Sequence, residues 1–336
     1  MSVIKWSKFA EKTIKELARV KEEENLLILA DINTNMDIAE ACLAAGLEKT
    51  SNAQLLIIRK ILDNERGGLN PVIHNAVVNS DIVIGLFKGS KFFSTNTRKE
   101  AVKRGTRIIS TQPEGIEEYI IQAVVEVDFP KMRKNAALMA DLWKESKKCH
   151  ITSSIGTDIS FKFQGRPIHI GDGAAKEPGE VQFFPGVQVL VAPIEETING
   201  TIVVDGVIVP GGLVSSPVTI KMGKGVIVNI EGKADANSWK SWLISLNDPT
   251  IYHLSHFNVG LNPKAKMNNN ETEAERAIGA VTFGFGHQPE FLKGNVITGK
   301  YHTEVILASP TIYIDDKIVL TDNKLNEKLG FINALI

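Results

Sequence analysis

The segment Tyr301-His302-Thr303-Glu304 carries two side chains that could bind one metal ion. Its pattern is typical of a β-strand, in which residues i and i+2 point to the same face. His302 and Glu304 could therefore reach one cation. Joined by a distant histidine, they would form the 2-His-1-carboxylate set that leaves open positions on iron(II) for oxygen and substrate. The alternative is a cross-strand ion pair on a half-exposed strand.

A second segment brings histidines to a tight turn. His253 and His256 precede Gly260 and the pair Asn262-Pro263, which are typical turn residues. A histidine placed just before such a turn can point into a cleft. It can equally be a surface or capping residue, and the local pattern does not choose between the two histidines.

A third segment combines turn residues with acidic and aromatic ones. Glu177-Pro178-Gly179-Glu180 is followed by a Phe184-Pro185-Gly186 turn and a β-like run that contains Gln188. Such a turn could aim Glu180 or Gln188 into a site. Ordinary hairpin chemistry explains the same pattern.

The elements that must position these residues change character near residue 150. Before it, strand-like apolar runs alternate with helical patterns, which predicts an α/β domain with a parallel sheet, Rossmann-like in type. We predict strands over 25–33, 54–60, 80–87 and 106–112. We predict helices over 6–18, 37–45 and 96–104, and a linking helix over 131–148.

After residue 150, short alternating strands are separated by Gly- and Pro-rich turns. Strand-like runs lie at 156–163 and 300–307, and a helical pattern lies at 271–280. We therefore predict two domains: residues 1–150, the α/β domain with its linking helix, and residues 151–336, an α+β, β-rich metal-binding domain.

Composition excludes several functional classes. The 336 residues hold 38 Lys and Arg against 39 Asp and Glu, so the net charge of −1 gives no general attraction to nucleic acid or anionic membranes. The 2 cysteines cannot form a disulfide framework. Neither GxGxxG nor GxxxxGK[ST] occurs, so no nucleotide cofactor is predicted. Residues 1–23 lack a signal-peptide pattern, and we expect a soluble cytoplasmic protein.

Five blocks in a fixed order resemble the thermophilic metalloaminopeptidases of the aminopeptidase T type. They are GTDISFKFQGR (156–166), FPGVQVLVAPIEETINGTI (184–202), HFNVGLNP (256–263), GAVTFGFG (279–286) and YHTEV (301–305). The resemblance implies an α/β N-terminal domain, a β-rich metal domain and self-association, so we expect a homodimer or larger homo-oligomer.

The ligand positions differ from those of a peptidase. Where the peptidases have two glutamates and a histidine, this chain has Gln188, His256 and Thr282. The loss of two carboxylates argues against a dinuclear site. What remains, His256, His302 and Glu304, resembles the single-iron set of the 2,5-dihydroxypyridine 5,6-dioxygenases, with Glu304 in place of their aspartate.

This resemblance implies an iron(II)-dependent, extradiol-like ring-cleaving dioxygenase. Its substrates would be O2 and a small hydroxylated N-heteroaromatic compound such as 2,5-dihydroxypyridine. We expect catalytic contributions from His169, Glu177 and Glu180, and substrate contacts from Phe184, Gln188 and Thr282. One alternative is a hydrolase with a single zinc or other divalent metal, because the ligand set suits both metals. A metal-free binding protein is the other.

Overall fold

A computed structural model gives the fold for residues 2–62, 67–111, 115, 118–296 and 298–336. The chain divides into two compact units, and each is described by itself. Unit 1 comprises Met1–Glu126 and Gly173–Gly186, and unit 2 comprises Val127–Asp172 and Val187–Ile336.

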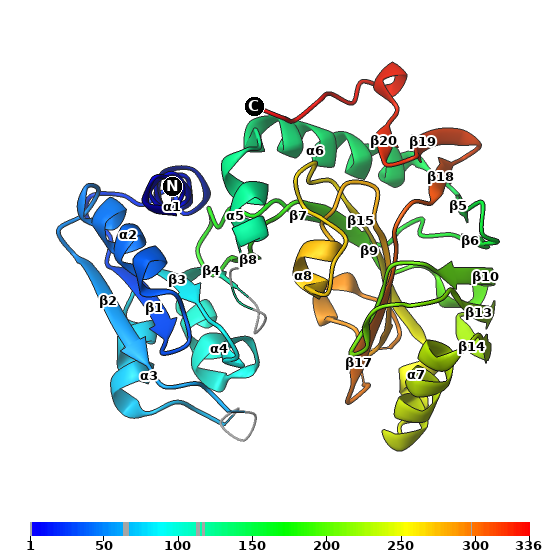
Figure 1. Ribbon diagram of the computed structural model, residues 1–336, viewed down its shortest axis with the longest axis horizontal. Coiled ribbons are helices and arrows are strands. Elements are labelled where there is room, and N and C mark those ends of the chain that lie inside the picture. The colour runs from blue at the N-terminus through cyan, green and yellow to red at the C-terminus, as the bar shows by residue number, and fades with distance from the viewer. Residues whose placement is uncertain (1, 63–66, 112–114, 116–117, 297) are drawn as a thin grey trace. The chain divides into compact units, whose positions relative to one another are not determined.

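Unit 1 is built on a parallel sheet with the strand order β2-β1-β3-β4-β8 (Figure 1). Its elements in chain order are α1 (Ser2–Lys12), a π-helical turn (Thr13–Leu17), β1 (Leu26–Asp31), α2 (Met36–Leu47), β2 (Ala53–Ile58), α3 (Pro71–Val78), β3 (Ile82–Leu86), a 3-10 turn (Phe92–Ser94), α4 (Asn96–Lys103), β4 (Arg107–Ser110), α5 (Glu118–Val125) and β8 (Val181–Phe183). The predicted parallel sheet is thereby confirmed; Gln112, the end of one predicted strand, lies outside the described residues.

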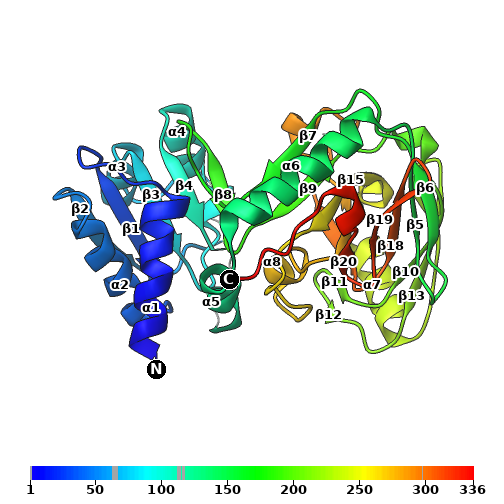
Figure 2. The same cartoon turned by 90° about the horizontal axis from the view of Figure 1, so that it is seen from above.

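Helices cover both faces of this sheet. Figures 1 and 2 show α3 and α4 on one face and α1, α2 and α5 on the other. Alternate residues of β1 explain this arrangement, because Leu27 and Leu29 join the apolar cluster that includes Val77 of α3 and Ala101 of α4. Strands that are buried on both faces are apolar along their length. In β1 every residue before Asp31 is apolar.

Unit 2 contains two sheets that share an aromatic core. One has the order β14-β13-β10-β6-β5-β18-β19-β20, the other β12-β11-β17-β16-β15-β9-β7. The elements are α6 (Phe129–Glu145), β5 (Cys149–Thr152), β6 (Asp158–Phe161), β7 (Ile168–Gly171), β9 (Gln188–Val191), β10 (Asn199–Val204), β11 (Val207–Ile208), β12 (Gly212–Leu213), β13 (Val218–Gly223), β14 (Val226–Glu231), α7 (Ala234–Ser245), β15 (Leu254–Gly260), α8 (Glu271–Ala274), β16 (Val281–Gly286), β17 (His302–Leu307), β18 (Thr311–Ile314), β19 (Lys317–Thr321) and β20 (Lys324–Leu325), with 3-10 turns at Glu195–Thr197, Pro249–Tyr252, Glu290–Leu292 and Glu327–Leu329.

Rings from both sheets meet in this core. Phe161 of β6 lies with its ring centroid 5.0 Å from that of Phe257 on β15 and 6.3 Å from that of Phe283 on β16. Trp143, near the end of α6, stacks on Phe257 at 5.0 Å. Figure 2 shows α6 running along β7 and β9, against which it packs. The β-rich character predicted for the second half of the chain is confirmed.

The division into units differs from the predicted boundary at residue 150. The linking helix, observed as α6, belongs to unit 2, and Gly173–Gly186 returns to unit 1. There β8 extends the parallel sheet by pairing Ile108 with Val181. A strand of only three residues has no pattern that reveals its partner, so the sequence placed it in the second domain. The helix predicted at 271–280 is likewise shorter, ending at Ala274.

Within the described ranges, no helix combines the length and the apolar character that crossing a lipid bilayer demands.

An ion pair between Arg107 and Glu24, whose side chains are 7% and 14% exposed, stabilises unit 1. The Arg107 guanidinium donates to both carboxylate oxygens of Glu24 at 2.7 and 2.8 Å, and to the carbonyl oxygen of Ala175 at 2.9 Å. We predict that Arg107→Met lowers the free energy of unfolding by about 3 kcal/mol, because it leaves the largely buried Glu24 carboxylate, 14% exposed, without its partner. Urea unfolding followed by circular dichroism measures this change.

Lys15→Met is the matched control. Lys15 pairs with Glu11 at the surface, where the two side chains are 40% and 58% exposed. Water screens an ion pair that is this exposed, so its loss should change the stability little. Equal losses in the two variants would contradict the structural role assigned to Arg107.

Candidate metal centre

The register of three neighbouring strands places His256, Gly284 and Glu304 in one row. His256 of β15 pairs with Gly284 of β16, and Gly284 pairs with Glu304 of β17. His302 lies two residues before Glu304, on the same face of β17, and pairs with Gly286. Side chains from the outer two strands can therefore meet over the glycines of the strand between them.

The three polar side chains converge to a small triangle. The Nε2 atoms of His256 and His302 lie 3.2 Å apart, and each lies 3.2 Å from Oε1 of Glu304. His256 and Glu304 are buried, whereas the side chain of His302 is 35% exposed. In the part of the chain that the structure describes, these are the three ligand-type side chains whose donor atoms gather closely enough to share one ion.

Gly284 makes this convergence possible. A Cβ atom built on it would lie 2.2 Å from Nε2 of His256 and 2.6 Å from its Cε1. Any other residue at position 284 would therefore occupy the space of the imidazole ring. The glycine is required for close approach, and its backbone φ is not in the left-handed region.

The donor set fits a divalent transition metal. Protein ligands lie about 2.1 Å from such an ion, and two of them at a right angle are then about 3 Å apart. The observed triangle, with sides of 3.2 Å, matches that spacing. Two imidazoles and one carboxylate suit iron(II) and zinc alike.

Electrostatics keep the carboxylate in the form that binds a cation. Burial alone would raise the pKa of Glu304, but hydrogen bonds from His256 and His302, with their charges, hold it well below its usual value. Burial alone would lower the pKa of His302, but the hydrogen bond and charge of Glu304 raise it above its ordinary value. Glu304 therefore stays ionised, and its negative charge can attract a cation to the point where the three donor atoms meet.

Behind His256 lies a layer of amide and carboxyl groups, in which Asn258 is buried and Gln188 and Glu275 are partly buried. Nδ1 of His256 is 3.1 Å from Oδ1 of Asn258, and Nδ2 of Asn258 donates to Oε1 of Gln188 at 2.8 Å and to Glu275 at 3.4 Å. His302 is held separately, because its Nδ1 donates to the carbonyl oxygen of His287 at 2.8 Å.

Sequence reasoning missed Asn258 and Glu275. Burial raises the pKa of the Glu275 carboxyl to about 7; the adjacent guanidinium of Arg276 opposes the rise and the charge of Glu304 adds to it. In the sequence, Glu275 lies in a helical pattern in which a glutamate is typical of the surface. The signal available for Asn258 was its i, i+2 spacing from His256, which places both side chains on one face of β15.

Three other predicted residues belong to this sheet. Gln188 accepts the hydrogen bond from Asn258, and Thr282 pairs with Asn258 across the strands. The Thr282 hydroxyl is fully buried and has no hydrogen-bond partner among the described residues. His169 pairs with Leu190, and its Nε2 donates to the carbonyl oxygen of Phe291 at 3.0 Å. Substrate contact by Gln188 and Thr282 stays a prediction, and the burial of Thr282 does not favour it.

The remaining predicted residues lie in unit 1. A carboxylate oxygen of Glu180 accepts hydrogen bonds from the backbone N–H groups of Lys176 (2.7 Å) and Glu177 (3.0 Å), which is a turn contact. Phe184 is buried, with its ring centroid 5.2 Å from that of Phe9. Catalytic roles for Glu177 and Glu180 and substrate contact by Phe184 stay predictions, and these contacts are structural ones.

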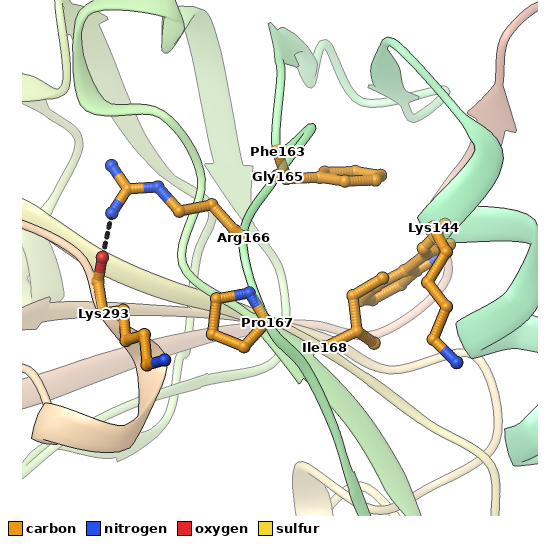
Figure 3. A pocket seen from close by; sticks show the side chains of 8 residues that line it. Lys144, Phe163, Gly165, Arg166, Pro167, Ile168 and Lys293 are labelled. Atoms are coloured by element: carbon orange, nitrogen blue, oxygen red, sulfur yellow. Dashed lines mark hydrogen bonds between the residues drawn. The ribbon is translucent and has the colours of Figure 1, made fainter.

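A separate pocket of about 330 Å³ lies at the end of α6 (Figure 3). Its Ile168 alternates with His169 along β7 and so points to the opposite face of the sheet. Arg166 is already paired there, donating to Glu195 at 2.6 Å and to the carbonyl oxygen of Lys293. None of the three candidate metal ligands lines this pocket.

Comparison with known proteins connects this geometry with one family. The family model described as 2,5-dihydroxypyridine 5,6-dioxygenase (NicX) matches residues 5–327. A curated 2,5-dihydroxypyridine 5,6-dioxygenase from Pseudomonas putida (strain KT2440) is 27% identical over 236 residues, which are 66% of this chain. The match spans 65% of the length of that relative.

Solved structures confirm the fold expected from the resemblance. The 2,5-dihydroxypyridine dioxygenase structure from Pseudomonas putida KT2440 aligns with a TM-score of 0.77 and 21% identity, covering 97% of this chain and 98% of that one. AmpT from Thermus thermophilus aligns with a TM-score of 0.68 and 14% identity, covering 96% and 99%. Both alignments show that the chain shares the fold of these two proteins, which is the fold that the resemblance implied.

We predict that Gly284→Ala strongly weakens metal binding without unfolding the protein. The new methyl group displaces the His256 imidazole, which should lower the affinity for a divalent ion by about 100-fold or more. Chelator competition with cobalt(II) measures the affinity, and circular dichroism reports the fold.

Gly211→Ala in the same unit is the control. Its added Cβ would meet only the carbonyl oxygen of Ile208, at an ordinary 3.4 Å. If Gly284→Ala bound the ion as tightly as Gly211→Ala, the convergence of these side chains on one ion would be disproved.

Proposed function

This chain belongs to the 2,5-dihydroxypyridine 5,6-dioxygenase family, and on that premise we propose that it is a mononuclear, non-heme iron(II) ring-cleaving dioxygenase. Its substrates would be O2 and a small hydroxylated N-heteroaromatic compound such as 2,5-dihydroxypyridine. The observation that carries the proposal is the triangle formed by His256, His302 and Glu304, with sides of 3.2 Å.

His256, His302 and Glu304 would hold the ion. An iron(II) ion bound by such a set has open positions for substrate and O2 and supplies the electron exchange that cleavage of a ring by O2 requires. The extra methylene of Glu304 relative to aspartate is compatible with this role. Its Oε1 lies equally far from both histidine nitrogens, so the longer side chain reaches the common position.

Two further side chains of the same sheet would serve the substrate. Gln188 is half-buried, and its Oε1 is engaged by Asn258, so its amide nitrogen can donate to a ring oxygen. His169 donates through Nε2 to Phe291, which leaves Nδ1 as a base. Burial lowers the pKa of His169, with a further contribution from Lys293, and the hydrogen bond to Phe291 opposes the change. A neutral imidazole can accept a proton from a ring hydroxyl.

We also propose a cytoplasmic homo-oligomer, a homodimer or larger. The two free cysteines, Cys42 and Cys149, are buried, which suits a reducing compartment. Sedimentation velocity measures the oligomeric state directly.

The deciding experiment is metal analysis of anaerobically purified protein. We expect about one iron per chain in the wild type, lost in His256→Ala, and O2 uptake with 2,5-dihydroxypyridine in the wild type alone. His253→Ala is the matched control, because His253 lies in the same segment but outside the triangle. It should keep both the iron and the O2 uptake.

Other metal contents would favour a different function for this protein. One zinc per chain with no O2 uptake would favour the hydrolase. Two ions per chain would show a dinuclear centre despite Gln188 and Thr282. A site that no divalent ion can fill would leave a binding protein.

The pH dependence of kcat/KM tests His169. As a base it must be neutral, so activity should fall as the pH drops through its pKa, which lies below the ordinary 6.5. His169→Asn should lower kcat by about 100-fold and remove this acid limb, while the iron content remains unchanged. An unchanged pH profile in His169→Asn would exclude His169 as the base.

A further inference from the structure

We propose that Asn258 is a positioning residue that fixes the His256 imidazole with its proton on Nδ1 and its Nε2 lone pair toward Glu304 and His302. The inference rests on the proposed function, because it concerns how a metal ligand is prepared. In this proposal Asn258, Gln188 and Glu275 lie behind the three metal ligands and hold one of them, His256, in place.

The orientation of the Asn258 amide follows from its acceptors. One end of the amide faces Oε1 of Gln188 at 2.8 Å and Oε2 of Glu275 at 3.4 Å. Oε1 of Glu275 pairs with the Arg276 guanidinium, which stabilises the ionised carboxylate. Oε2 of that carboxylate can only accept a hydrogen bond, so this end of Asn258 is the NH2 group. The other end, 3.1 Å from Nδ1 of His256, is therefore the carbonyl oxygen Oδ1.

The proton on His256 follows from that oxygen. Oδ1 is an acceptor only, so Nδ1 of His256 must donate to it. A metal ion that binds here would displace the proton that Nε2 donates to Glu304. The imidazole then carries one proton, on Nδ1, and its Nε2 atom presents the lone pair. Nε2 is the atom that lies 3.2 Å from Glu304 and from Nε2 of His302. The amide thus selects the tautomer that can bind a metal, and it makes the ligand more basic.

The amide is itself held tightly. Asn258 is 1% exposed, so its hydrogen bonds do not compete with water. Glu275 is brought to it by a close backbone contact, since a Cβ on Gly260 would lie 2.6 Å from the Glu275 carbonyl oxygen. Arg276 pairs with the Glu275 carboxylate on its far side. Alternate residues 256, 258 and 260 of β15 therefore provide the ligand, its hydrogen-bond acceptor and the space for Glu275.

Asn258→Leu and Asn258→Asp separate this role from simple packing. Leucine has a similar size and no acceptor, whereas aspartate retains an oxygen for Nδ1–H. Zinc(II) serves as the probe because it is diamagnetic. Chelator competition measures its affinity, and proton NMR of the zinc-loaded protein detects the hydrogen-bonded Nδ1–H of His256 through its low-field resonance.

The proposal predicts a split between the two variants. Asn258→Leu should bind zinc about 10- to 100-fold more weakly and lose the low-field resonance, and Asn258→Asp should keep the affinity within about threefold and retain the resonance. Unchanged affinity in Asn258→Leu, or an equal loss in both variants, would overturn the positioning role and leave the proposed function standing. Failure of the wild type to bind zinc, cobalt or iron would overturn the proposed function itself.

Circular dichroism shows whether each variant folds. If Asn258→Leu does not fold, the wild type and Asn258→Asp still decide the matter. A low-field Nδ1–H resonance present in both supports the proposal. Its absence from the zinc-loaded wild type refutes it.

Discussion

The register between β15, β16 and β17 is the constraint on which the rest of the site depends. Because side chains alternate along a strand, the same register that sets His256, Gly284 and Glu304 in one row directs Phe257 and Phe283 into the core. A slip of one residue would exchange the two faces and place aromatic rings where the donor atoms meet. The aromatic core therefore stabilises the site as well as the fold.

Close packing at two glycines allows the side chains that this register places in one row to meet. Gly284 leaves space for an imidazole, and Gly260 lets the segment after α8 approach β15 so that Glu275 reaches Asn258. Around these contacts the charges are paired: Glu304 with two histidines, and Glu275 with Arg276. Buried charges of this kind are stable only when such partners are present.

Unit 1 uses its polar groups in a different way. Asp31, fully buried at the carboxyl end of β1, accepts hydrogen bonds from the backbone N–H of Lys88 at 2.8 Å and from the Ser90 hydroxyl at 2.7 Å. In parallel sheets this edge is where ligands commonly bind. Here the Asp31 side chain at that edge accepts hydrogen bonds from the loop after β3. This structural use of Asp31 agrees with a chain that has no nucleotide-binding motif.

The sequence by itself determined the classes of element and the local half of the site. Apolar runs specified the parallel strands of unit 1, and the i, i+2 spacing of His302 and Glu304 specified that they share a face, because both properties depend on neighbouring residues alone. Only the tertiary structure decided the rest. The return of β8 to the first sheet and the meeting of Asn258 with Gln188 and Glu275 both join positions distant in the chain. Strand register and backbone approach fix such contacts, and no local pattern encodes them.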